Sequence, residues 1–97
     1  MGRILQLIPT YGLSLKRVGP GPRSRRALRA ELSRLESGPL PGPGDFEAFL
    51  SLPAVGVAWA RAVPDVELWV LYRISELHVS LWEVTEQEPM RAEPLTD

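Results

Sequence analysis

Apolar and polar residues alternate along most of the C-terminal third of the chain. In residues 55–63, one set of alternate positions holds valines, a tryptophan and an arginine, and the other holds glycine and alanines. The alternation resumes in residues 66–74, after the turn pair Pro64 and Asp65, and again in residues 77–84. Successive side chains of a strand point to opposite faces, so a period of two predicts strands. Three such segments joined by short turns predict an antiparallel meander.

The N-terminal half has a different pattern. Residues 3–8 form a short apolar run, which predicts a first strand. Residues 11–18 are a candidate for a short helix, and residues 24–37 predict a longer helix that a glycine and a proline stop. Three leucines of the longer helix recur at helical spacing: Leu28, Leu32 and Leu35. Residues 45–52 could add one or two helical turns. This order predicts an α+β fold with an N-terminal strand, one or two helices and then a three-stranded antiparallel meander.

The 97 residues, of which 44% are hydrophobic, fit one domain. We place this domain at residues 1–85 and expect the acidic tail, residues 86–97, to be flexible. No apolar run approaches the ~20 residues that a membrane helix needs, and the first residues do not resemble a secretory signal. We therefore expect a cytoplasmic location and no membrane partner. With no cysteine and one histidine, the chain is not expected to hold a metal or another cofactor.

The charges are divided unevenly along the chain. Residues 1–35 contain eight basic residues and one acid, a net charge of +7, whereas residues 36–97 contain three arginines and eleven acids, a net charge of −8. Such asymmetry suggests a basic surface for phosphates or for an acidic partner, unless the two halves neutralise each other across the fold. Arg25, Arg26 and Arg29 belong to this basic region. They are candidates for a nucleic-acid or protein contact, and the alternative is a solvated helix face.

Parts of the meander resemble the RelE/ParE toxin superfamily. The resemblance is carried by residues 59–61, by the turn at Pro64 and Asp65, and by residues 70–74, which read VLYRI. It implies a RelE-like fold, in which an apolar strand and two helices rich in lysine and arginine precede a curled antiparallel sheet. The RelE branch of the family implies a ribosome-dependent endoribonuclease that cuts messenger RNA, and the ParE branch implies a gyrase inhibitor. Members of both branches are neutralised by an antitoxin.

The resemblance implies three candidate catalytic residues, two of which match family positions. Arg61 matches the family's arginine on the first meander strand, Tyr72 matches its tyrosine on the next strand, and Arg73 lies beside that tyrosine. In an RNA-cleaving member, the 2′-hydroxyl attacks the adjacent phosphate, and arginine suits the developing charge because its rigid fork matches phosphate. The alternative for Arg61 is a rim arginine that stacks on Trp59, with Tyr72 in the core.

Two departures from the family pattern favour binding over cleavage. Trp69 stands where many members have an arginine, three positions before the tyrosine. The last strand runs into an acidic segment that contains Glu86 and Glu88, and carboxylates there would repel RNA phosphates. If the face of Tyr72 is the inward one, Trp69 and Trp82 form with Leu71 an exposed apolar patch of the kind found at protein interfaces. The alternative is that residues 39–52 cover this patch.

The resemblance therefore implies a toxin-like domain that binds a macromolecular target, either the ribosome and its RNA or gyrase, and that an antitoxin-like protein neutralises. Its functional face would contain four residues: Trp59, Arg61, Trp69 and Arg73. The alternatives are a ribosome-dependent endoribonuclease and a non-toxic, degenerate RelE-fold adaptor for protein interactions. Whether the chain is an enzyme and whether it forms a homodimer stay open.

Overall fold

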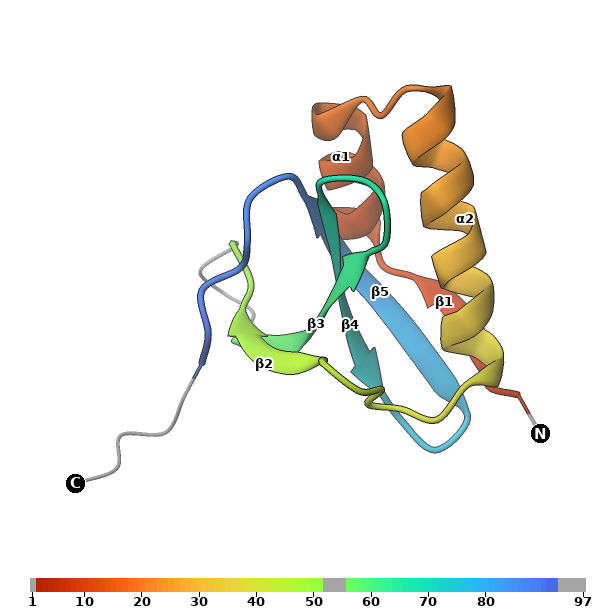
Figure 1. Ribbon diagram of the computed structural model, residues 1–97. Coiled ribbons are helices and arrows are strands. Elements are labelled where there is room, and N and C mark those ends of the chain that lie inside the picture. The colour runs from red at the N-terminus through yellow and green to blue at the C-terminus, as the bar shows by residue number, and fades with distance from the viewer. Residues whose placement is uncertain (1, 52–55, 93–97) are drawn as a thin grey trace.

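A strand, two helices and four more strands follow one another in the computed structural model, which describes residues 2–51 and 56–92 (Figure 1). The elements are β1 (Ile4–Leu7), α1 (Pro9–Val18), α2 (Pro22–Ser37), β2 (Phe46–Phe49), β3 (Val57–Val63), β4 (Leu68–Ile74) and β5 (His78–Thr85). The α+β class predicted from the sequence is confirmed. Neither helix in the described part of the chain is long and apolar enough to cross a membrane.

The five strands form one mixed sheet in the order β1-β5-β4-β3-β2. Strand β1 runs parallel to β5, with Ile4 opposite His78, and the other neighbours are antiparallel. The sheet is therefore larger than the predicted three-stranded meander. The prediction missed two pairings: the N-terminal strand returns to the last one, and an additional strand lies beside β3.

The additional strand, β2, corrects the prediction of helical turns at residues 45–52, of which residue 52 lies outside the described part. Phe46, Phe49 and Leu50 follow one another at helical spacing, which imitates a short helix. Residues 46–49 instead pair with β3, where Phe46 lies opposite Ala60. The backbone hydrogen bonds of this edge pairing outweigh the local pattern, because a segment of four residues is too short for a stable helix.

The two helices stand side by side, while β2 and the start of β3 curl away from them (Figure 1). Helix α1 starts two residues before the predicted segment, with Pro9 at its first turn, where proline costs no hydrogen bond. It ends at Gly19, whose left-handed conformation (φ of 58°) favours glycine and whose N–H donates to the carbonyl of Leu15. Leu28 and Leu35 of α2 are buried against the sheet, as the leucine spacing predicts.

Both faces of the sheet are apolar and both are covered. The helices cover the face that carries Tyr72, which is fully buried. On the other face, Leu71 is only 1% exposed. It packs in a second cluster with residues of β2 and β3 and with Leu50 and Trp82. Leu71 therefore does not belong to an open apolar patch, because part of the segment 39–52 covers it.

Helix α1 is hydrogen-bonded to β5 at the point where the pairing of β4 with β5 is irregular. The register between β4 and β5 shifts, so that Leu81 and Glu83 have partners on β4 and Trp82 has none. The hydroxyl of Thr10 donates a hydrogen bond of 2.8 Å to the carbonyl of Trp82, and the N–H of Val84 donates one of 2.9 Å to the hydroxyl of Ser14. Two hydroxyls of α1 thus satisfy backbone groups beside the bulge.

The segment after β5 turns back along the outer edge of β2. The N–H of Phe49 donates to the carbonyl of Met90, and the N–H of Ala92 donates to the carbonyl of Glu47, each at 2.9 Å. The guanidinium of Arg91 lies 4.1 Å from the ring centroid of Phe46. Of the tail that we expected to be flexible, residues 90–92 thus contact β2, and residues 93–97 lie outside the described part.

Candidate functional site

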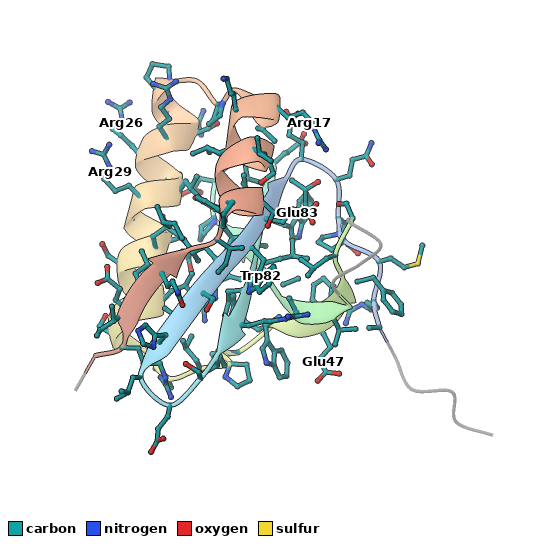
Figure 2. All side chains as sticks on the ribbon, turned by 180° about the vertical axis from the view of Figure 1, so that it is seen from behind. Arg17, Arg26, Arg29, Glu47, Trp82 and Glu83 are labelled. Atoms are coloured by element: carbon teal, nitrogen blue, oxygen red, sulfur yellow. The ribbon has the colours of Figure 1, made fainter. Side chains whose placement is uncertain are left out.

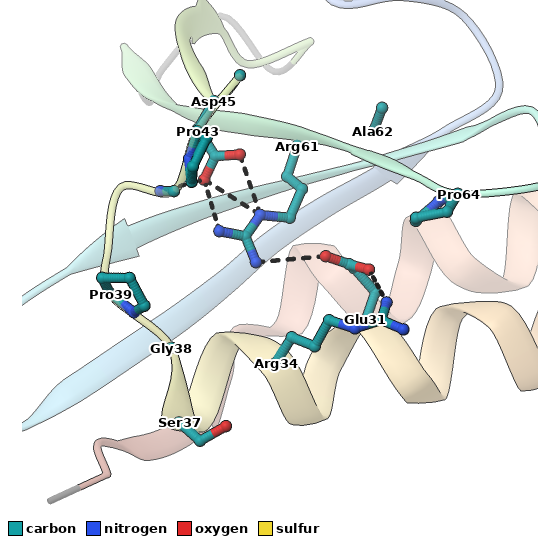
Figure 3. A pocket seen from close by; sticks show the side chains of 12 residues that line it. Glu31, Arg34, Ser37, Gly38, Pro39, Pro43, Asp45, Arg61, Ala62 and Pro64 are labelled. Carbon is teal, nitrogen blue, oxygen red and sulfur yellow. Dashed lines mark hydrogen bonds and ion pairs between the residues drawn. The ribbon is translucent and has the colours of Figure 1, made fainter.

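A network of buried charges joins α2, the loop before β2, and β3 (Figure 3). Arg61 on β3 lies between two carboxylates. Its Nε is 3.0 Å from Oδ1 of Asp45, its Nη2 is 2.9 Å from Oδ2 of Asp45, and its Nη1 is 3.3 Å from Oε2 of Glu31. The side chains of Arg61, Asp45 and Glu31 are 12%, 3% and 6% exposed. Arg34, at the solvent side, donates to the other oxygen of Glu31.

Tyr72 on β4 is tied to the same carboxylate. Its hydroxyl donates to Oδ2 of Asp45, which also accepts a 3.0 Å hydrogen bond from the backbone N–H of Gly42. Burial and this hydrogen bond to Asp45 raise the pKa of Tyr72, because both favour the neutral phenol over the phenolate. Tyr72 is therefore held as a neutral hydrogen-bond donor.

The environment of Arg61 keeps it charged. Burial by itself lowers the pKa of Arg61, but the hydrogen bond and charge of Asp45 and the charge of Glu31 raise it, and the net direction is upward. Two arginines and two carboxylates thus balance in this network. Breaking one of its buried pairs would leave an uncompensated charge, which is strongly unfavourable.

A surface hollow of about 500 Å³ opens beside this network, between the C-terminal half of α2 and the loop before β2 (Figure 3). Glu31, Arg34, Asp45 and Arg61 line it together with the backbone of the loop. The loop passes so close to Arg61 that a Cβ atom at Gly42 would collide with the guanidinium. The charged groups of this hollow are bonded mainly to one another.

A second hollow, of about 540 Å³, lies between α1, α2 and β1. We call it the basic groove. Its apolar lining comes from all three elements: Leu5, Leu7, Tyr11, Leu15, Leu28 and Leu32. Three cations surround this lining: Lys16, Arg25 and Arg29. The hydroxyl of the buried Tyr11 makes no hydrogen bond to the described residues, and burial raises the pKa of Tyr11.

The charges around the basic groove are not neutralised within the described residues. The ion pairs found there join only Arg34, Arg61 and their carboxylates. The sequence has no acid before Glu31. Arg26 and Arg29 project outward from α2, and Arg17 projects from α1 (Figure 2). The paired helices thus carry exposed basic side chains on more than one side, and those of the basic groove lie next to β1 at the edge of the sheet.

The structure brings together two of the three residues predicted for catalysis. Arg61 and Tyr72 share the helix-covered face of the sheet, and the guanidinium carbon of Arg61 lies 5.8 Å from the ring centroid of Tyr72. Arg73 points to the opposite face, where its guanidinium lies 4.5 Å from the ring of Trp82 and its Nε donates to the carbonyl of Val57 at 2.9 Å.

The predicted functional face is therefore wrong as a single surface. Trp59 lies opposite Tyr72 in the ladder, so it shares the face of Arg61, whereas the pleat turns Trp69 and Arg73 the other way. Trp82 packs against the second apolar cluster, on the side of Leu71. The three arginines predicted for binding, Arg25, Arg26 and Arg29, are all exposed on α2.

Sequence reasoning missed the two carboxylates that hold the network together. Glu31 gave a usable signal, because it lies on the apolar stripe of α2 between Leu28 and Leu35 and is the only acid among the first 35 residues. An acid on a buried face needs a cationic partner. Asp45 gave none, because a carboxylate in a loop rich in glycine and proline is normally solvated.

Comparisons of the chain with models of known protein families, with curated proteins and with solved structures find no match. No group of three histidine, aspartate or glutamate side chains in the described part of the chain is placed to hold a metal ion.

Proposed function

We propose that the chain is a toxin-like domain of a toxin–antitoxin type system, which acts in the cytoplasm by binding a macromolecular target and is neutralised by an antitoxin-like protein. The order of the elements supports the RelE-like arrangement on which this proposal rests: a strand, two basic helices and a curled sheet. Arg61 and Tyr72 occupy neighbouring strands of that sheet.

The observation that carries the proposal is the basic groove beside the outer edge of β1. An apolar lining surrounded by cations that form no ion pair with the described residues fits a segment that is apolar on one side and acidic on the other. Among the described residues, β1 pairs only with β5, so its outer backbone groups are available to an added strand. An antitoxin-like protein with an acidic, extended or helical segment has the chemistry that this surface requires.

Cleavage has less support than binding. The side chains of Arg61 and Tyr72 are both hydrogen-bonded to Asp45, inside the domain. Arg73 lies on the other face, so the three residues do not converge on one phosphate. The ribosome-dependent endoribonuclease therefore remains the alternative proposal, and it requires that purified protein cut messenger RNA on ribosomes.

The test uses two variants with the same kinds of substitution. The groove variant carries Leu7→Gln, Arg25→Gln and Arg29→Gln, all at exposed positions that line the groove. The control variant carries Leu13→Gln, Arg17→Gln and Arg26→Gln, which are equally exposed but lie outside the groove.

Expression of the wild-type chain should arrest growth, and co-expression of the protein encoded by the neighbouring reading frame should relieve the arrest. That protein should co-purify with the wild-type chain and the control variant, and at least tenfold less with the groove variant. Absence of both arrest and co-purification would overturn the proposal. Co-purification without arrest would instead support the non-toxic adaptor.

A further inference from the structure

A second exposed apolar surface lies at the edge of the sheet opposite the basic groove. Phe49 on β2 and Val57 on β3 face each other directly in the ladder, and the backbone of Phe49 is bonded to Met90. Phe49 is 49% exposed and Met90 is 73% exposed. Large side chains this exposed, gathered at one place, are typical of a contact surface.

Acids accompany this apolar surface. Glu47 shares the face of Phe49, because the two residues alternate with Ala48 along β2. Glu88 lines the same hollow of about 440 Å³ as Phe49 and Met90. Two arginines of the described part of the chain are near these residues. Arg91 lies against Phe46 on the other face of β2, and Arg73, which stacks over Trp82, lines a hollow with Glu47 and Val57. We call the five residues the acidic patch: Glu47, Phe49, Val57, Glu88 and Met90.

The acidic patch and the basic groove are complementary in charge, and both expose apolar side chains. The groove has an apolar lining and three cations around it, and the patch presents exposed apolar side chains together with two carboxylates. They lie on opposite sides of the molecule: Figure 2 shows Arg26 and Arg29 on one side and Glu47 on the other. The sheet order separates them in the same way, with β1 at one edge and β2 at the other.

We propose that the acidic patch of one copy of this chain docks in the basic groove of a second copy. Two grooves cannot face each other, because Lys16, Arg25 and Arg29 would meet the same cations across a two-fold axis. Within one molecule, the two surfaces lie at opposite edges of a five-stranded sheet. The contact is therefore heterologous, and each docked copy leaves one free groove and one free patch. Such contacts build open head-to-tail chains.

This contact occupies the groove that the proposed function assigns to the antitoxin-like protein, so it regulates access to that groove. The contact itself forms without an antitoxin-like partner. An acidic partner and the patch of a second copy would compete for Arg25 and Arg29. Binding of the partner would dissolve the chains, and self-association would shield the groove when the partner is absent. Salt should weaken the contact, because the charges are exposed and screening acts over about 10 Å at moderate ionic strength.

The experiment measures weight-average mass against protein concentration by sedimentation equilibrium at low ionic strength. The wild-type chain should rise above the 10.8 kDa of one copy and pass twice that mass without a plateau. The groove variant defined above should stay at one copy. A patch variant with Glu47→Gln, Glu88→Gln and Met90→Gln, all at exposed positions, should also stay at one copy. The control variant should behave as the wild type.

An equimolar mixture of the groove and patch variants tests directly whether an intact patch binds an intact groove. The intact patch of the first fits the intact groove of the second, so the mixture should reach twice the mass of one copy and stop there. Circular dichroism confirms that each variant is folded. A wild-type chain that stays a single copy at every concentration overturns the inference. So does a wild-type mass that stops at two copies, association by either variant alone, or a mixture that stays at one copy.

Discussion

Tyr72 and Asp45 are 27 positions apart, and the buried phenol of the first donates its hydrogen bond to the carboxylate of the second. This carboxylate also binds Arg61, so one loop residue satisfies groups on two strands. Two of the three residues that the resemblance placed at a catalytic site are thus held by a carboxylate that the sequence did not point to.

Replacement of Asp45 should destabilise the fold more than loss of any exposed acid. In Asp45→Asn, Arg61 keeps only Glu31 as an ionic partner in an environment where it is 12% exposed. Removing one partner from a buried ion pair costs about 3–5 kcal/mol. Denaturant unfolding should show a loss of this size, while the exposed Glu76→Gln should change the free energy of unfolding by less than about 0.5 kcal/mol. Equal effects of the two substitutions would show that the network adds no stability.

Stability should fall at alkaline pH because of the two tyrosines. The pKa of Tyr72 and the pKa of Tyr11 are both raised above the usual 10.0, by burial in each case and also by Asp45 for Tyr72. The unfolded chain therefore releases these protons first. The stabilisation is complete below pH 10 and declines above it, by up to about 1.4 kcal/mol per pH unit for each tyrosine.

Urea titrations on both sides of pH 10 measure this decline, and Tyr72→Phe should remove about half of the slope. The same variant should lose about 1.5–3 kcal/mol at neutral pH, because the hydrogen bond that it removes is made to a charged group. A slope that Tyr72→Phe leaves unchanged would contradict the burial of the phenol.

The hydroxyl of Ser14 should be needed at the bulge of β5. It donates to the carbonyl of Tyr11 and accepts from the N–H of Val84, so Ser14→Ala leaves a buried backbone donor without a partner. The expected cost is about 1–3 kcal/mol in the free energy of unfolding. Ser33→Ala, at an exposed position of α2, is the matched control and should be nearly neutral. Hydrogen exchange at Val84 should accelerate in the Ser14 variant alone.

Leu71 should behave as a core residue. Although neither helix of the described residues covers its face of the sheet, it is buried in the second apolar cluster. Leu71→Ala should cost about 2–5 kcal/mol, as expected for a buried leucine, whereas Leu77→Ala, at an exposed position, should cost little. Thermal or denaturant unfolding separates the two. A small effect at Leu71 would mean that the curl of β2 does not enclose this face.

The period-two pattern predicted β3, β4 and β5 well, because alternation is a local property of the chain. The leucines of α2 were equally informative, since Leu28 and Leu35 lie on its buried face. Pairing between distant segments was not predictable in this way. The sequence near Ile4 does not indicate that Ile4 pairs with His78. The sequence near Phe46 does not indicate that Phe46 pairs with Ala60.

The candidate site was likewise predicted from the sequence only in part. The functional face predicted from the sequence grouped Arg61 with Trp69 and Arg73, whereas the ladder places Arg61 on the face of Tyr72. Alternation within one strand does not show which of its faces it shares with the next strand. The shared partner of Arg61 and Tyr72, Asp45, comes from a loop whose path depends on the tertiary fold, so its role could not be predicted from the sequence. The exposed arginines of α2 could be named from the sequence, but the apolar groove beside them needs β1 and α1 in place.

The parallel pairing of β1 with β5 also has a consequence during synthesis. The first strand must wait for the last one, because its ladder partners, from His78 to Leu81, are made more than 70 residues later. Closing so long a loop before the contact forms slows folding. Until then Leu5, which packs against the core in the folded chain, stays uncovered on the nascent chain, where a chaperone that binds apolar segments could shield it.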